Sequence, residues 1–342
     1  MQTRRLTTSE ADIRSAGELI RSGRLVAFPT ETVYGLGADA TNAEAVKSIY
    51  AAKGRPSDNP MIVHIAEISG LSELVKGGYE AVPELALDAM KAFWPGPLTI
   101  ILPKSDEVPS VTTGGLNTVA IRMPENETAR RLIAAAGTPI AAPSANLSGK
   151  PSPTRDTDVL EDMDGRIDAV IMGEDCNVGI ESTVVDMTGE VPTILRPGFI
   201  TAEALGEALG TEVIYDESLF DKHELAEPSE GVSEGDFQPK SPGMKYKHYS
   251  PNASVKLIEG DNKKFEAVAL ELAKQALQEG RKAAILNYEE DARAAAHKLF
   301  ADMRELDRQG YDLILIRAID EVGLGFSVMN RMLKSAGYDV VE

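Results

Sequence analysis

The chain has 342 residues, enough for about two domains of average size, and 43% of them are hydrophobic. Lys and Arg number 35 against 54 Asp and Glu, and the net charge of −19 argues against a protein that coats nucleic acid nonspecifically. The single cysteine, Cys176, excludes a disulfide scaffold and a zinc ribbon. The sequence shows neither a signal-peptide core nor a run of about 20 apolar residues, so we expect a cytoplasmic protein without a membrane span.

The first part of the chain alternates short β-rich apolar runs with helical patterns, which is typical of α/β architecture. Strands are predicted at 25–28, 61–65, 98–102, 119–123, 140–142, 169–172, 182–186 and 193–195. Helices are predicted at 43–53, 84–93, 127–136 and 202–210, with Asn42 capping the first and Pro83 opening the second. These elements predict a first domain over residues 1–215.

An acidic segment at 216–252 follows and ends in the motif SPGMKYKHYSP. Its first part, 216–236, holds eight carboxylates against the single Lys222, and such a run repels itself and folds poorly. We interpret the segment as a linker, with an acidic docking tail as the alternative.

The α/β pattern then restarts over residues 253–342. Strands are predicted at 255–258, 283–286 and 313–316, and helices at 265–277, 292–306 and 328–333. Strands separated by helices of this length predict parallel pairing, so we expect a smaller Rossmann-like βαβ domain.

The motifs of the phosphate loop, the zinc proteases, the serine hydrolases and the kinases are absent. Gly35, Gly37 and Ala40 form a G-x-G-x-x-A string, but residues 29–34 separate the glycines from the preceding strand. A dinucleotide site needs such glycines at a tight turn between strand and helix, so we treat it as a minor alternative.

Polar and cationic side chains follow one of the predicted strands and one of the predicted helices. Thr30 and Thr32 come directly after strand 25–28, where side chains line the cleft of an α/β sheet. The segment KGRPSDNP supplies Lys53, Arg55 and Asn59, two cations and an amide that suit a polyphosphate. The alternatives are a turn held by threonine hydroxyls and a lysine that complements a helix C-terminus.

His64 and Arg122 lie on two further predicted strands. A histidine in an apolar strand is commonly structural, but the cationic loop that precedes His64 favours a functional role. Arg122 stands at the carboxyl end of its strand, where a cation would hold a carboxylate; a surface ion pair with Glu125 is the alternative.

Hydroxyls and one more cation occur in later segments. The loop PIAAPSANLSGKPSPT contains Ser144, Asn146 and Ser152 among small residues that let backbone amides approach a phosphate or a purine. Ser182 and Arg196 lie at the ends of later strands. Each feature is weak alone, and only their combination predicts a ligand pocket.

Taken in order, the segments FPTETVYGLGADA, KGRPSDNP, FWPGPLTIIL, VAIRMP, APSANLSGKPSPT, GIESTVVD and ILRPG resemble the YrdC-type domain of threonylcarbamoyl-AMP synthases. The resemblance spans about residues 15–200, and SPGMKYKHYSP with the following βαβ unit is similar to the rest of the long, two-domain form. It implies a twisted mixed sheet with helices for the first domain. It also implies a nucleotidyltransferase that converts L-threonine, bicarbonate and ATP to threonylcarbamoyl-AMP and pyrophosphate. A separate tRNA threonylcarbamoyl transferase would then complete N6-threonylcarbamoyladenosine in tRNA.

The resemblance also implies the site residues. The L-threonine pocket would comprise Thr32, His64, Arg122, Ala142 and Ser182. The ATP contacts would be Lys53, Arg55, Asn59, Thr118, Ser144, Asn146, Ser152, Arg196 and Tyr246, with His248 as a further contact from the linker. Lys53, Arg55 and Arg196 would act in catalysis by stabilising charge, because the attacking oxygen belongs to the substrate's own carbamate. Mg2+ would arrive with ATP, and no metal site on the protein is implied.

Two other functions remain open at this point. A carbamoyltransferase of the hydrogenase-maturation type shares the YrdC-type domain, but a single cysteine does not support its zinc-finger part. A non-catalytic RNA-binding module is the second, and direct contact with tRNA stays open. We expect the C-terminal domain to gate the pocket through the linker.

Overall fold

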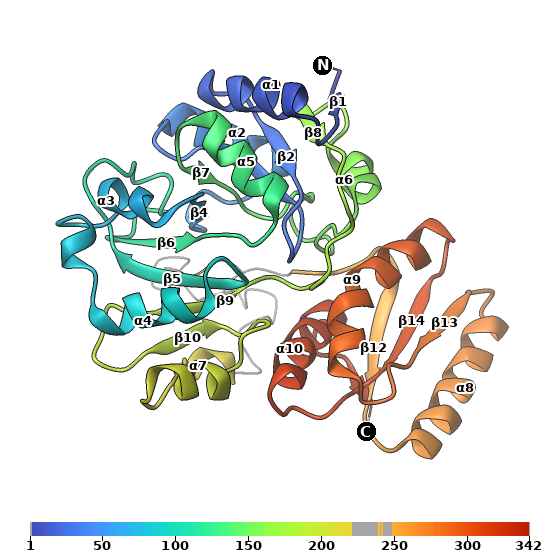
Figure 1. The fold of residues 1–342 in the computed structure, drawn as a ribbon. Helices are drawn as coiled ribbons and strands as arrows, with labels where there is room; N and C mark the ends of the chain where they lie inside the picture. The colour runs from blue at the N-terminus through green and yellow to red at the C-terminus, as the bar shows by residue number, and fades with distance from the viewer. Residues whose placement is uncertain (1, 221–238, 240, 242–247, 342) are drawn as a thin grey trace, which may run out of the picture.

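Two α/β units make up the computed structural model, which describes residues 2–220, 239, 241 and 248–341 (Figure 1). Tyr246 and most of the acidic segment lie outside the described residues. The last strand of the first unit ends at Tyr215, and the first strand of the second unit begins at Ser254. None of the helices in the described part of the chain has the length and apolar character that crossing a membrane requires.

Within the described residues, the first unit forms an 11-stranded mixed sheet in the order β1-β8-β2-β3-β7-β4-β6-β5-β9-β10-β11. Its strands are β1 (Arg4–Leu6), β2 (Val26–Phe28), β3 (Gly35–Asp39), β4 (Ile62–His64), β5 (Leu98–Pro103), β6 (Thr118–Arg122), β7 (Ile140–Ala141), β8 (Ala169–Ile171), β9 (Thr183–Asp186), β10 (Thr193–Arg196) and β11 (Ile214–Tyr215). The predicted mixed sheet is confirmed. Every strand predicted for this domain is present, displaced by no more than one residue at either end.

Helices cover both faces of this sheet. They are α1 (Glu10–Arg21), α2 (Ala43–Lys53), α3 (Leu71–Leu74), α4 (Glu84–Phe93), α5 (Glu127–Ala136), α6 (Asp156–Met163) and α7 (Ala202–Leu209), with the 3-10 turns η1 (Ile68–Gly70), η2 (Tyr79–Ala81) and η3 (Glu217–Leu219). The predicted cap is confirmed, because the Asn42 side chain accepts hydrogen bonds from the amides of Glu44 and Ala45. Helices α1 and α5 bury Ile20 and Leu132 against one face of the sheet, and α2 and α4 lie on the other.

The G-x-G string lies inside a strand rather than at a helix start. Strand β3 pairs antiparallel with β2, and Phe28 is opposite Gly35. A Cβ atom at Gly37 would lie 2.8 Å from the Phe28 ring and 2.8 Å from Ile140. The glycines therefore make room for a buried aromatic ring, and the dinucleotide-site alternative is wrong.

Parallel pairing of β4 and β6 brings two predicted site residues together. His64 and Arg122 are register partners at the carboxyl ends of these strands. Strand β7 runs antiparallel along the other edge of β4, with Ile140 opposite His64. Since the carboxyl ends of parallel strands meet at one edge of a sheet, both side chains reach the same cleft.

The second unit contains the predicted βαβαβα succession, followed by a short fourth strand that was not predicted. It comprises β12 (Ser254–Ile258), α8 (Asn262–Gln278), β13 (Ala283–Leu286), α9 (Ala292–Arg308), β14 (Leu313–Arg317), α10 (Leu324–Ala336) and β15 (Val340–Val341). All pairs in its sheet are parallel, in the order β13-β14-β12-β15. Leu313 and Leu315 pack with α8, whereas Ile314 and Ile316 pack with α9 and α10. The predicted parallel pairing is confirmed.

Helices α9 and α10 face the first unit (Figure 1). Val33 and Ile180 of the first unit share an apolar core with Leu299 and Phe300 of α9. Three arginines add charged contacts between the units: Arg304 to Asp162 at 2.7 Å, Arg308 to Asp158 at 2.8 Å, and Arg331 to Glu181 at 3.3 Å. The C-terminal unit is thus joined to the first by packed side chains as well as by the chain between them.

Candidate active site

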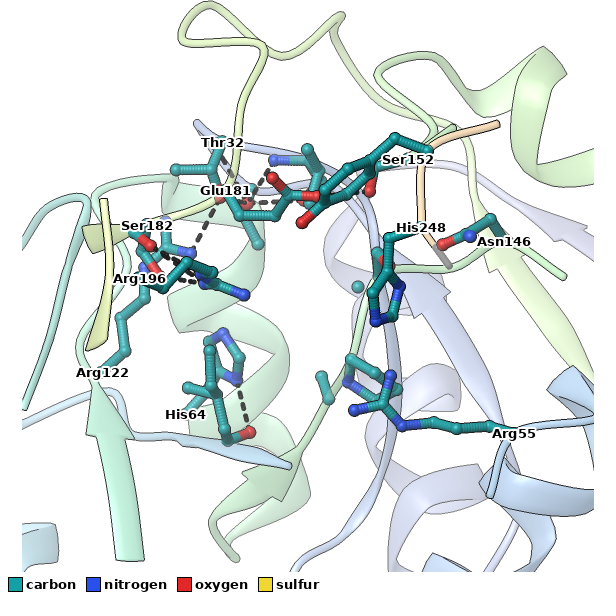
Figure 2. A pocket seen from close by; sticks show the side chains of 18 of the residues that line it. Thr32, Arg55, His64, Arg122, Asn146, Ser152, Glu181, Ser182, Arg196 and His248 are labelled. Carbon is teal, nitrogen blue, oxygen red and sulfur yellow. Dashed lines mark hydrogen bonds between the residues drawn. The ribbon is translucent and has the colours of Figure 1, made fainter. Parts of the chain in front are cut away.

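A pocket lies where the ends of β2, β4 and β6 meet the loop after β7 and the segment His248–Tyr249 (Figure 2). Ten of the predicted site residues line it: Thr32, Arg55, His64, Arg122, Ala142, Ser144, Asn146, Ser152, Ser182 and Arg196. These residues are spread over more than 160 positions of the chain, so only the fold brings them together.

Three guanidinium groups enter this pocket from different elements. Arg55 follows α2, Arg122 ends β6, and Arg196 ends β10. Burial lowers the pKa of Arg55 to about 10, and the charge of Arg196 adds to that effect. Burial likewise lowers the pKa of Arg196 to about 10. Both remain charged at neutral pH, so the pocket concentrates positive charge in a weakly solvated space and favours an anionic ligand.

Arg122 is held by three acceptors. Its Nε donates to the Gly96 carbonyl at 3.2 Å and its Nη1 donates to the Thr32 hydroxyl at 2.8 Å. Its Nη2 lies 2.6 Å from the buried Glu31 carboxylate. Burial would raise the pKa of Glu31, but the charge of Arg122 outweighs it and the pKa is lowered. The ion pair with Glu125 that the sequence left open is therefore wrong, because Arg122 turns inward to Glu31.

His64 is a neutral member of the pocket. Burial, with the nearby charge of Arg122, lowers the pKa of its imidazole to about 3. Its Nδ1 lies 3.1 Å from the Ile62 carbonyl, so Nδ1 carries the hydrogen and Nε2 keeps a lone pair. At neutral pH the ring therefore offers hydrogen bonding without adding to the positive charge.

Ser182 and Arg196 form a second rigid pair. Arg196 donates to the Ser182 carbonyl from Nε at 3.1 Å and from Nη2 at 2.9 Å, and Nη2 also lies 3.1 Å from the Ser182 hydroxyl. That hydroxyl is 2.7 Å from the hydroxyl of Thr99 on β5. The guanidinium is thereby fixed at the rim, with N–H groups left for a ligand.

Three predicted ATP residues do not line this pocket. Lys53 is the last residue of α2, and its ammonium donates to the carbonyls of Ser144 and Asn146 instead of complementing its own helix. Asn59 is buried behind the wall, and its carbonyl accepts from Tyr50 at 3.0 Å. Thr118 begins β6, at the end of the strand away from Arg122. Lys53 therefore holds the loop that lines the pocket.

The pocket also contains residues that the sequence did not single out. Glu181, Lys150 and Tyr249 line it. His248, which was expected as a linker contact, also lines the pocket, and its Nε2 is buried without a hydrogen-bond partner among the described residues. Glu181 directly precedes Ser182 in the sequence. Its place beside a predicted site residue was the one sequence signal that could have identified Glu181 as part of the pocket.

The geometry supports binding and charge stabilisation more than covalent catalysis. The described residues contain no group of three or more His, Cys, Asp or Glu that could hold a metal ion. Cys176 is buried, and burial raises the pKa of its thiol, so it is not an activated nucleophile. The site can orient anions and lower the energy of negative charge as it develops.

The mixed sheet, the arginine-lined pocket and the parallel C-terminal sheet define a two-domain α/β enzyme that binds anionic small molecules. Residues 18–198 match the Sua5/YciO/YrdC family, described as "Telomere recombination", and residues 200–337 match the C-terminal domain of threonylcarbamoyl-AMP synthase. The chain belongs to the threonylcarbamoyl-AMP synthase family, whose members use ATP and form an adenylate.

Individual relatives match along the whole chain. The threonylcarbamoyl-AMP synthase of Pyrococcus abyssi is 45% identical, covering 97% of this chain and 96% of the relative. That of Bacillus subtilis is 43% identical, covering 99% and 97%. The crystal structure of P. abyssi Sua5 complexed with L-threonine matches with a TM-score of 0.89 and 42% identity, covering 100% of this chain and 99% of that one. These matches favour the synthase over the carbamoyltransferase and the RNA-binding module.

Proposed function

We propose that this enzyme joins L-threonine, bicarbonate and ATP into threonylcarbamoyl-AMP with release of pyrophosphate. The observation that carries the proposal is the convergence of Arg55, Arg122 and Arg196 on one pocket that also presents hydroxyl groups. An amino-acid carboxylate, a carbamate and a triphosphate are three anionic groups, and guanidinium ions bind such oxygens in pairs.

Threonine would occupy the part of the pocket around Arg122. Arg122 has five N–H donors and three protein contacts, which leaves donors for the substrate carboxylate. Thr32 and Ser182 place hydroxyls nearby, and the neutral His64 can bond the substrate hydroxyl. Ala142 gives the substrate methyl group an apolar neighbour.

The nucleotide would lie across the cations and the loop after β7. Arg55 and Arg196 would bind the phosphates, and Ser144, Asn146 and Ser152 would contact the nucleotide from the loop. Lys53 would not contact the nucleotide directly. It would hold the loop in place through its hydrogen bonds to the carbonyls of Ser144 and Asn146. By resemblance, Asn59 and Thr118 would contact ATP beyond the pocket described above.

The reaction needs no protein nucleophile. The threonine amine forms a C–N bond with bicarbonate, and one water leaves to give the carbamate. A carbamate oxygen then attacks the α-phosphorus of ATP. The bond between the α-phosphorus and the oxygen that bridges it to the β-phosphorus breaks, and pyrophosphate leaves. Fixed guanidinium groups favour this transfer because they need not reorganise as charge shifts toward pyrophosphate.

Magnesium would accompany ATP as part of the substrate. The described residues hold no carboxylate cluster for a resident ion, and Glu181, the carboxylate that lines the pocket, is paired with Arg331. This donor set does not fit a protein-held Mg2+, which is commonly bound by substrate phosphates and water. Binding of ATP with its Mg2+ would therefore need no metal ligand from the protein.

The product is a mixed anhydride, so an acceptor must take the threonylcarbamoyl group. We assign that step to tRNA adenosine and a separate transferase in the cytoplasm. His248 and Tyr249 would close the pocket over the nucleotide until release, since both line it from the segment before the second unit.

Pyrophosphate release is the direct test. We expect it to require threonine and bicarbonate together, and we expect the mass spectrum of the product to show the 13C label of bicarbonate in the mixed anhydride with AMP. Pyrophosphate release that ignores threonine would contradict the proposal. Salt-sensitive tRNA binding without any adenylate would instead support the RNA-binding module.

A further inference from the structure

Arg331 is a buried arginine that leaves its own domain. It lies on α10, is 0% exposed, and ranks first among the largest fully buried side chains of the described residues. Its Nε and Nη2 each donate to Oε2 of Glu181 at 3.3 Å, and its Nη1 donates to the Pro197 carbonyl. Both acceptors belong to the first unit.

Glu181 carries this contact to the pocket. It lines the pocket, and its Oε1 accepts a hydrogen bond of 2.5 Å from the hydroxyl of Ser152 (Figure 2). Burial would raise the pKa of Glu181, but the charges of Arg331 and Arg196 outweigh it and the pKa is lowered. The carboxylate is therefore ionised, and its two oxygens link α10 to Ser152.

The second anchor lies directly after Arg196. Besides the bond from Arg331 to Pro197, the Ser327 hydroxyl of α10 donates to the Gly198 carbonyl at 2.7 Å. A Cβ atom at Gly198 would lie 2.3 Å from the Thr183 amide nitrogen, so this turn is tightly packed against the start of β9. A shift of the turn would therefore move Arg196.

Arg331 also lies near Tyr249, a third part of the pocket lining. Its guanidinium carbon lies 6.0 Å from the centroid of the Tyr249 ring, and Tyr249 also lines the pocket. One side chain of the C-terminal unit thus contacts Glu181, the segment after Arg196, and Tyr249. A residue that served only to join the two units would not need contacts to three parts of the pocket wall.

We propose that Arg331 is a positioning residue for the nucleotide side of the pocket, through which α10 sets the positions of Ser152 and Arg196. The inference rests on the proposed function and extends it. The C-terminal unit acts on the reaction through a direct side-chain contact, in addition to the segment that connects the units.

The test uses the full chain and compares Arg331→Met with Arg308→Met. Arg308 is the matched control, because it joins the units through Asp158 at 2.8 Å and none of its partners in the described part of the chain lines the pocket. We expect Arg331→Met to lower kcat/KM for ATP by about tenfold to a hundredfold, as small misplacements of positioning groups do. The KM for threonine should change by less than about threefold, since the contacts of Arg122 with Thr32 and Glu31 and of His64 with Ile62 do not involve Arg331 or Arg196. Arg308→Met should leave both values near wild type.

A double variant separates positioning from stability. In Arg331→Met the Glu181 carboxylate loses its main partner, which destabilises the fold; adding Glu181→Gln removes that buried charge. We expect the melting temperature to recover in the double variant while kcat/KM for ATP stays low. Three results would overturn the inference. They are recovery of both the melting temperature and kcat/KM for ATP in the double variant, an equal ATP defect in Arg308→Met, and ATP kinetics within twofold of wild type in Arg331→Met.

Two further measurements make the outcome decisive. If Arg331→Met does not fold, Arg331→Lys carries the same test, because it keeps the charge but loses the fork of donors. Calorimetric binding of α,β-methylene-ATP to the wild-type chain checks the proposed function separately. No binding there would count against the function, whereas equal binding by wild type and the Arg331 variant would count against the positioning role.

Discussion

Replacing Lys53 by methionine tests whether its ammonium supports the pocket loop or contacts ATP. The change keeps most of the aliphatic stem and removes the donor to the carbonyls of Ser144 and Asn146. Each buried carbonyl left without a partner costs about 1–3 kcal/mol, or about 2–6 kcal/mol for the two. Burial lowers the pKa of Lys53 well below its usual value, so relief from burying the ammonium offsets part of that cost. We expect a net loss of about 2–4 kcal/mol.

Thermal unfolding with pyrophosphate kinetics measures the effect. At about 2–4 °C per kcal/mol for a unit of this size, the melting temperature should fall by about 4–16 °C. Lys47→Met is the matched control on the same helix, because Lys47 is exposed and its ion pair among the described residues is with the exposed Glu44. An unchanged melting temperature together with a tenfold or larger rise in KM for ATP, a change of about 1.4 kcal/mol, would refute the support role and show that Lys53 reaches the phosphates.

Three other outcomes follow from the site. Arg122→Gln should raise the KM for threonine far more than that for ATP, and the reverse pattern would reject Arg122 as the carboxylate partner. The pKa of His64 is about 3 in the fold against 6.5 for a free imidazole, so its neutral form contributes stability in full above pH 6.5, and this is lost as pH falls toward 3. Denaturant titrations from pH 6 to 4 should therefore show that wild type loses about 1.4 kcal/mol more per pH unit than His64→Gln; parallel curves would contradict this. Valine should be rejected more strongly than serine, because valine leaves buried polar groups unpaired whereas serine lacks only a methyl contact; equal adenylate formation from both would argue against a hydroxyl-recognising pocket.

Most of the fold could be predicted from local patterns. The helix after Asn42 and the strand at 283–286 are encoded by neighbouring residues, as a capping side chain or a short β-rich run. Strand β3 could not be predicted, because its glycines look like a turn until Phe28 from β2 packs over them. Strand β3 forms because of a contact between two strands, and such a contact cannot be recognised from neighbouring residues in the sequence.

The site could be predicted only in part, because residue types can be read from local segments whereas contacts between distant segments cannot. The cations and hydroxyls that line the pocket stand in recognisable segments, so their gathering could be expected from the chain. Lys53 and Arg55 are two positions apart and both donate to backbone carbonyls, yet only Arg55 of the two lines the pocket. Which way each points depends on how α2 ends against the loop after β7.

Residue types and their periodicity determined two α/β units, the order of their elements and an anion-binding character, because these properties come from neighbours in the chain. Only the tertiary structure decided that Arg122 pairs with Glu31 and that Arg331 reaches Glu181 across 150 positions. A buried charge takes whatever partner the packing places beside it, since leaving it unpaired away from water costs too much, and the packing depends on the whole fold.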